Sequence, residues 1–128
     1  MSRRRDAHHA HAAAVSALGK TLTRRAASTC ELCKKTEDLR PIEVPPTLET
    51  PDTSRALLGC TSCRELLASD RMPRDPQNLR FLEDAVWSDV MPVKLAAIRL
   101  LQRIAPEVAW ARDVADTLWI EEEIEALL

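Results

Sequence analysis

Glycine is scarce in this chain, which has only Gly19 and Gly59 among 128 residues. Tight hairpin turns and phosphate-binding loops rely on glycine because it adopts positive φ without strain, so neither is expected to be prominent. The scarcity favours helices over a large sheet. Aromatic residues make up only 3% of the chain and tyrosine is absent, so the core must consist mostly of Leu, Ile, Val and Ala.

Long apolar segments are also missing. No stretch is long and apolar enough to cross a membrane, and no apolar signal-peptide core follows the arginines at positions 3–5. These absences predict a cytoplasmic protein. A length of 128 residues with 45% hydrophobic and 30% charged residues is typical of one soluble domain.

No catalytic pattern stands out. The sequence shows no Ser-His-Asp arrangement, no pair of carboxylates suited to acid–base chemistry and no Gly-rich loop. The three histidines are His8, His9 and His11. They could bind a metal ion as a cluster, but without a rigid element we expect them to belong to a disordered basic tail over residues 1–11. We therefore predict no catalytic residues and no organic cofactor.

What the sequence does contain is two Cys-x-x-Cys pairs, Cys30/Cys33 and Cys60/Cys63, and no other cysteine. Each pair can turn both sulfurs toward one point, and two pairs supply the four thiolates of a closed tetrahedral zinc site. The 26 residues from Lys34 to Gly59 are enough to fold back and bring the pairs together. We predict Zn²⁺ as the cofactor, with these four cysteines as its ligands.

Two other uses of the cysteines are less consistent with the sequence. A disulfide framework requires an oxidising compartment, and nothing at the N-terminus directs the chain to one. A thioredoxin-type redox motif requires a strand–helix–strand context, which neither pair has. A site closed by four cysteines leaves no coordination position for water or substrate, so its expected role is structural.

The expected fold is a small α+β zinc finger flanked by helices. An N-terminal helix is predicted over residues 12–29, the finger over 30–70 and a helical part over 77–128. Within the finger, 39–44 and 56–58 are expected to be short strands, and a helix should begin at the second cysteine pair. A helix at that pair is typical of a treble clef; a zinc ribbon, with both pairs on hairpins, is the alternative.

About three helices are predicted in the C-terminal part. One spans 79–88, one runs from Pro92 to Ile104 because proline is favourable in a first turn, and one is opened by Pro106. Trp87 is expected to pack at the base of the last two. The apolar stripe of the middle helix is Val93, Ala97, Leu100, Leu101 and Ile104.

Charge is distributed unevenly. Residues 1–25 hold six basic residues and one acidic residue, whereas residues 113–128 hold six acidic residues and no basic one. The basic N-terminal arm could contact nucleic acid, which makes a nucleic-acid-binding regulator an alternative function. Against it, the net charge is -2 and no aromatic stacking residues accompany the arginines.

The cysteine pattern also resembles that of HNH nucleases, in which two such pairs surround a hairpin that carries a histidine. A nuclease of this kind needs that histidine as a general base. The corresponding segment here, LRPIEVPP, contains Glu43 but no histidine, and we interpret Glu43 as a solvated strand residue. A degenerate HNH-like nuclease is therefore a third hypothesis.

Five segments together resemble the N-terminal zinc-binding region of the bacterial PhnA family, which is named for its association with alkylphosphonate-utilisation genes. The segments are CELCKKTEDL, EVPP, LLGCTSC, LEDAVWSDVMPVKLAAIRLLQRI and DVADTLWIEEE. The resemblance runs from about Ser28 to Glu123. It implies a zinc-binding module with Cys30, Cys33, Cys60 and Cys63 as the ligands. Because no catalytic pattern is present, we expect a non-catalytic binding or adaptor module with a protein partner. The gene association of the family suggests a link to phosphonate metabolism.

Overall fold

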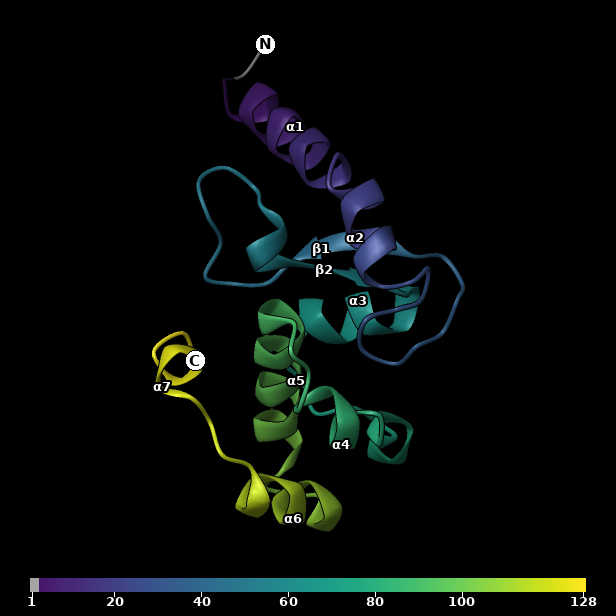
Figure 1. The fold of residues 1–128 in the computed structure, drawn as a ribbon, viewed down its shortest axis with the longest axis vertical. Coiled ribbons are helices and arrows are strands. Elements are labelled where there is room, and N and C mark those ends of the chain that lie inside the picture. The colour runs from purple at the N-terminus through teal and green to yellow at the C-terminus, as the bar shows by residue number, and fades with distance from the viewer. Residues whose placement is uncertain (1–2) are drawn as a thin grey trace.

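A computed structural model describes residues 3–128 and begins with two helices, α1 (Arg3–Ser16) and α2 (Gly19–Arg25) (Figure 1). The prediction of a disordered tail over residues 1–11 is wrong for residues 3–11, and residues 1 and 2 lie outside the described part. Five alanines between positions 7 and 14 explain the helix, because alanine has the highest helix propensity.

The N-terminal helix predicted over 12–29 is in fact interrupted and ends early. A turn at Ala17 and Leu18 separates α1 from α2, immediately before Gly19. After α2 the chain leaves the helical conformation at Ala27 and Ser28, whose φ angles are 53° and 61°.

A two-stranded antiparallel sheet follows, formed by β1 (Arg40–Glu43) and β2 (Ala56–Gly59). Arg40 lies opposite Gly59, and Glu43 lies opposite Ala56. All four residues of β2 are buried. Pro41 is tolerated because each strand of a two-stranded sheet has a free edge. Helix α3 (Thr61–Ala68) begins directly after β2, so the predicted order of strand, strand and helix is confirmed.

The C-terminal part contains four α-helices where about three were predicted. They are α4 (Leu82–Ala85), α5 (Met91–Ile104), α6 (Ala109–Thr117) and α7 (Glu122–Glu125), and a 3₁₀ turn at Pro76–Leu79 precedes them. Pro92 lies in the first turn of α5, as predicted.

Pro106 does not open α6, contrary to the prediction. It lies in the turn between α5 and α6, and Arg112 donates hydrogen bonds of 3.1 Å to the carbonyls of Ala105 and Pro106. This guanidinium therefore fixes the turn, and α6 begins only at Ala109, after the extended residue Val108.

Helix α5 is the centre of the core. Ten of its 14 residues are buried, including the whole predicted stripe of Val93, Ala97, Leu100, Leu101 and Ile104. One apolar cluster runs from the cysteines through this helix to α6 and α7. Arg99 of α5 donates to the carbonyl of Pro45 and, at 2.6 Å, to that of Leu127, which ties both the loop after β1 and the C-terminus to α5.

Trp87 is not the core residue that the sequence suggested. Helix α4 packs against α5, and Leu82 and the following Val86 are fully buried in the shared core, whereas Trp87 is 51% exposed. The buried contact at the base of α5 is thus made by aliphatic side chains, and the indole lies at the surface.

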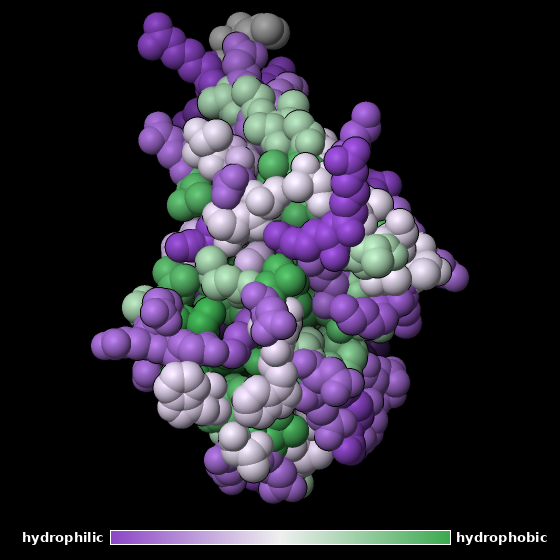
Figure 2. Space-filling view, viewed as in Figure 1, coloured by the Kyte–Doolittle hydropathy of each residue, from purple (hydrophilic) through white to green (hydrophobic). Residues whose placement is uncertain are grey.

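The surface of the molecule reflects this arrangement. In Figure 2, apolar side chains gather in the middle of the molecule, while the end that carries α1 shows mostly polar and weakly apolar residues. No residue of α1 is buried. Among residues 3–128, no helix combines the length and apolar character needed to cross a membrane.

Candidate metal centre

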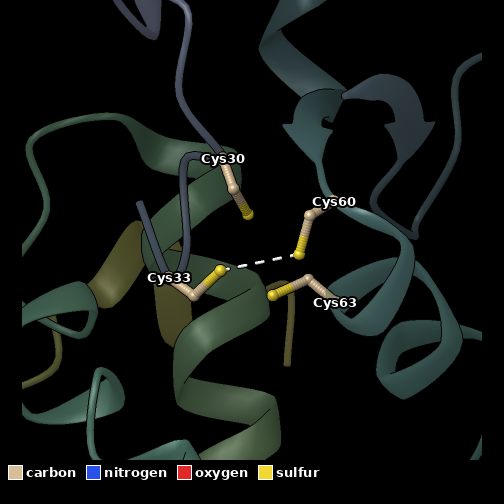
Figure 3. Close-up of side chains that lie close together, drawn as sticks. All are labelled: Cys30, Cys33, Cys60 and Cys63. Carbon is tan, nitrogen blue, oxygen red and sulfur yellow. Dashed lines mark hydrogen bonds between the residues drawn. The ribbon is translucent and has the colours of Figure 1, made fainter. Parts of the chain in front are cut away.

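The four cysteine side chains point into one space between the two Cys-x-x-Cys pairs (Figure 3). All four Sγ atoms lie within 4.8 Å of one another, and Cys33 Sγ and Cys60 Sγ are 3.5 Å apart. A tetrahedral zinc with Zn–S bonds of about 2.3 Å requires S–S distances of roughly 3.8 Å. The cluster therefore has the dimensions of a four-thiolate metal site and could hold a metal ion.

Local backbone geometry positions each pair. In the first, the Cys30 amide donates to the Lys35 carbonyl at 2.7 Å and the Lys34 amide donates to the Cys30 carbonyl at 3.0 Å, which closes the chain into a tight turn. In the second, Cys60 is the N-cap of α3 and Cys63 lies in its first turn. The positive end of a helix favours thiolates at that position.

The thiols differ in their acidity. The hydrogen bond from the Cys63 thiol lowers the pKa of Cys30 to about 4, with help from backbone amides. Burial raises the pKa of Cys33 to about 11. The pKa of Cys63 is also raised, first because its thiol is engaged with Cys30 and then because it is buried. One thiolate is thus favoured in the cluster, and a bound cation would be needed to stabilise the others.

A polar clamp fixes the two pairs relative to each other. Arg64 of α3 donates to the carbonyls of Asp38 and Gly59, at 2.6 and 2.7 Å, and to the Asp38 carboxylate at 3.0 Å. The hydroxyl of Thr61 donates to the same carboxylate at 2.6 Å. These bonds lower the pKa of Asp38, the Thr61 bond most strongly. The segment after the first pair is thereby held against the helix that carries the second.

A second polar network joins the first pair to β2 and α2. The carboxylate of Glu31 is only 4% exposed and receives two hydrogen bonds from Arg25, at 2.8 and 2.9 Å. It also accepts the amide proton of Leu58 at 2.8 Å, while the Glu31 amide donates to the Leu58 carbonyl. Arg25 further donates to the carbonyls of Thr53 and Ala56. The Glu31 carboxylate is therefore paired with the Arg25 guanidinium and with a backbone amide.

The structure corrects the interpretation of Glu43. Its side chain is 15% exposed, not solvated, and one carboxylate oxygen lies 2.5 Å from Nε2 of His11 on α1. A histidine from outside the LRPIEVPP segment, His11, therefore contacts this hairpin residue. His8 and His9 are exposed. Within the described part of the chain, the cysteines are the only group of three or more His, Cys, Asp or Glu residues with gathered donor atoms.

A groove of about 800 Å³ lies beside the cysteines, between α3 and residues 69–81. Cys33 and Cys63 contribute to its wall, and Leu66, Leu79 and Phe81 provide apolar surface. Four basic and two acidic side chains also line it: Lys35, Arg71, Arg74, Arg80, Glu65 and Asp75. These six side chains carry a net charge of +2, and the Arg80 guanidinium among them is paired with Glu83 at 2.7 Å.

The structure brings together all four cysteines that the sequence identified. Sequence reasoning missed the polar partners: Arg25 with Glu31, Arg64 with Asp38, and His11 with Glu43. They are 6, 26 and 32 residues apart, and no periodic pattern marks such pairs in a single sequence.

In comparisons with known proteins, no family model, curated protein or solved structure matches this chain.

Proposed function

We propose that Cys30, Cys33, Cys60 and Cys63 hold one structural Zn²⁺ and that the protein is a non-catalytic binding module. The observation that carries the proposal is the convergence of the four sulfurs within 4.8 Å. Thiolates are soft ligands, and a tetrahedral set of four is typical of zinc. Such a shell has no free position for water or substrate, which favours a structural over a catalytic role.

The finer fold that we propose for the finger is a treble clef. The first pair lies in a turn, a hairpin follows, and the second pair lies at the start of α3. A zinc ribbon would instead place the second pair on another hairpin. The helix start at Cys60 therefore supports the treble clef.

We further propose the groove beside the cysteines as the binding surface. Its volume is within the range of about 300–1,000 Å³ that is usual for ligand pockets. The combination of apolar walls and the exposed guanidinium groups of Arg71 and Arg74 suits an acidic peptide segment of a protein partner. The resemblance to the PhnA family agrees with a zinc-dependent adaptor, and it is the basis for proposing a link to phosphonate metabolism.

Metal analysis of the protein purified without added metal tests this function. We expect one zinc per chain in the parent and its loss in Cys63→Ser. Replacement of zinc by Co²⁺ should give the absorption bands of tetrahedral thiolate coordination. Absence of zinc, or a mapped Cys30–Cys33 disulfide in protein kept under reducing conditions, would contradict the proposal.

The groove has a separate test. Arg71→Glu and Arg74→Glu together should abolish capture of the acidic partner by the zinc-loaded protein, whereas Arg4→Glu on α1 should leave it unchanged. Retained capture by the double variant would exclude the groove as the binding surface.

Nucleic-acid binding is the second candidate function, and one observation favours it. Helix α1 has no buried residue and carries Arg3, Arg4 and Arg5, all exposed, in its first turn. Phosphate contacts would make affinity for DNA fall steeply as salt is raised, and Arg4→Glu with Arg5→Glu should abolish binding. Metal-dependent nicking of the same DNA would instead support a nuclease-like activity.

A further inference from the structure

We propose that a second metal site lies between α1 and β1, where His8, His11 and Glu43 bind a divalent transition metal such as Zn²⁺. This site is separate from the four cysteines and does not depend on the function proposed for them. Its ligands come from two elements that already contact each other.

The first argument is the contact between His11 and Glu43. His11 Nε2 lies 2.5 Å from Glu43 Oε1, so an imidazole and a carboxylate from distant parts of the chain are already paired. The other oxygen of this carboxylate, Oε2, is buried and has no hydrogen-bond partner among the described residues. Buried polar atoms are normally satisfied, so this oxygen is available to a cation or to a hydrogen-bond donor.

The second argument is the position of His8. It lies three residues before His11 on α1, and this spacing brings two Cβ atoms on one helix face to within about 5–6 Å. Helical metal sites use ligands at this i, i+3 spacing. His8 is exposed, so its ring is free to rotate toward the pair. His9 is about 100° further around the helix and cannot join the same set.

The third argument is chemical. Imidazole and carboxylate are a common ligand set for Zn²⁺, with bonds of about 2.0–2.2 Å. A metal bound to both partners in a tetrahedral geometry would separate the His11 nitrogen and the Glu43 oxygen by roughly 3.4 Å. The present contact would therefore open by roughly 1 Å, and the His8 ring would turn inward. Three protein ligands would leave one coordination position open, unlike the cysteine site.

The test is equilibrium dialysis of the full, tag-free protein against micromolar free Zn²⁺, followed by zinc analysis. We expect two zinc ions per chain in the parent, one at the cysteines and one at the new site. His8→Ala should weaken the second site at least tenfold and return the count to one. Because His8 is exposed, this substitution leaves the fold intact, and circular dichroism verifies that.

His9→Ala is the matched control, since it removes a neighbouring imidazole from another face of α1. It should keep two zinc ions per chain, whereas His11→Ala and Glu43→Gln should lose the second one. A parent whose bound zinc is lost entirely in Cys63→Ser would overturn the proposal, because no zinc would then bind outside the cysteines. An equal loss in His8→Ala and His9→Ala would also overturn it, because it would show unspecific binding by the histidine-rich segment.

Discussion

Lys34 follows the first cysteine pair in a backbone conformation that favours glycine. Its φ is 70°, in the left-handed region, and its amide must point back at the Cys30 carbonyl to close the turn. A residue with a Cβ is strained there by about 1–2 kcal/mol. The turn tolerates this strain because the cysteines and the Arg64–Asp38 clamp fix both of its ends.

Substitution of Lys34 tests whether the turn carries this strain. Lys34→Gly should be at least as stable as the parent, whereas Lys34→Val should be less stable than Lys34→Gly by about 1–2 kcal/mol or more, because a β-branched residue is especially disfavoured at positive φ. Both variants remove the same charge, so their difference isolates the backbone effect. Urea unfolding of the zinc-loaded proteins measures it, and equal midpoints would show that the turn relaxes.

Glu31 illustrates why polar residues resist prediction from sequence. It lies between the cysteines of the first pair, where an acidic residue would be expected to face solvent. Instead, its amide and its carboxylate bond to the carbonyl and amide of Leu58, and Arg25 neutralises it. Removing either partner would leave a charge without its counterion in a largely buried position, which is generally destabilising.

At the scale of elements, the parts that could be predicted are those with local rules. The spacing of the cysteines predicted the metal cluster because a Cys-x-x-Cys turn is determined within four residues. Pro92 and the apolar stripe predicted α5 because both signals act within one helix. The prediction failed at α1, where alanine propensity outweighed a polar composition. It also failed at Pro106, where the Arg112 guanidinium six residues later bonds to the carbonyls of the turn. The predicted packing of Trp87 in the core was wrong because the neighbouring Leu82 and Val86 are the buried residues there.

The burial of α5 leads to a prediction about Leu101, which is fully buried. Leu101→Ala should lower the free energy of unfolding by roughly 2–5 kcal/mol, because it removes apolar contacts and leaves a cavity. Glu122→Ala, at an exposed position of α7, should change it by less than about 0.5 kcal/mol. Thermal or urea unfolding compares the two. Small and equal effects would show that the stripe is not packed within the monomer.

At the scale of the whole molecule, the cysteines and the C-terminal helices share one core. Cys30, Cys60 and Cys63 belong to the same apolar cluster as Ile104, Ala111 and Ile124. Loss of the metal should therefore affect residues far from the site, and not the finger alone.

Chelation of the metal should accordingly shift a single unfolding transition. After treatment with a strong chelator, we expect far-UV circular dichroism and tryptophan fluorescence to show one common, lower midpoint, because Trp110 packs on the same core as the cysteines. Restoring Zn²⁺ should recover the original midpoint. Separate midpoints for the two signals would show that the finger and the helical part unfold independently.

Helices α1 and α5 have the same length, 14 residues, but opposite surroundings: no residue of α1 is buried, whereas ten of α5 are. In deuterated water, the amide protons of the two helices should therefore exchange at different rates. Amide protons of α1 should exchange through local fraying, soon after dilution, whereas those at the centre of α5 should exchange only when the entire molecule opens. The slowest amides of α5 would then report the global free energy of unfolding without any denaturant, and faster exchange there than in α1 would contradict the central position of α5.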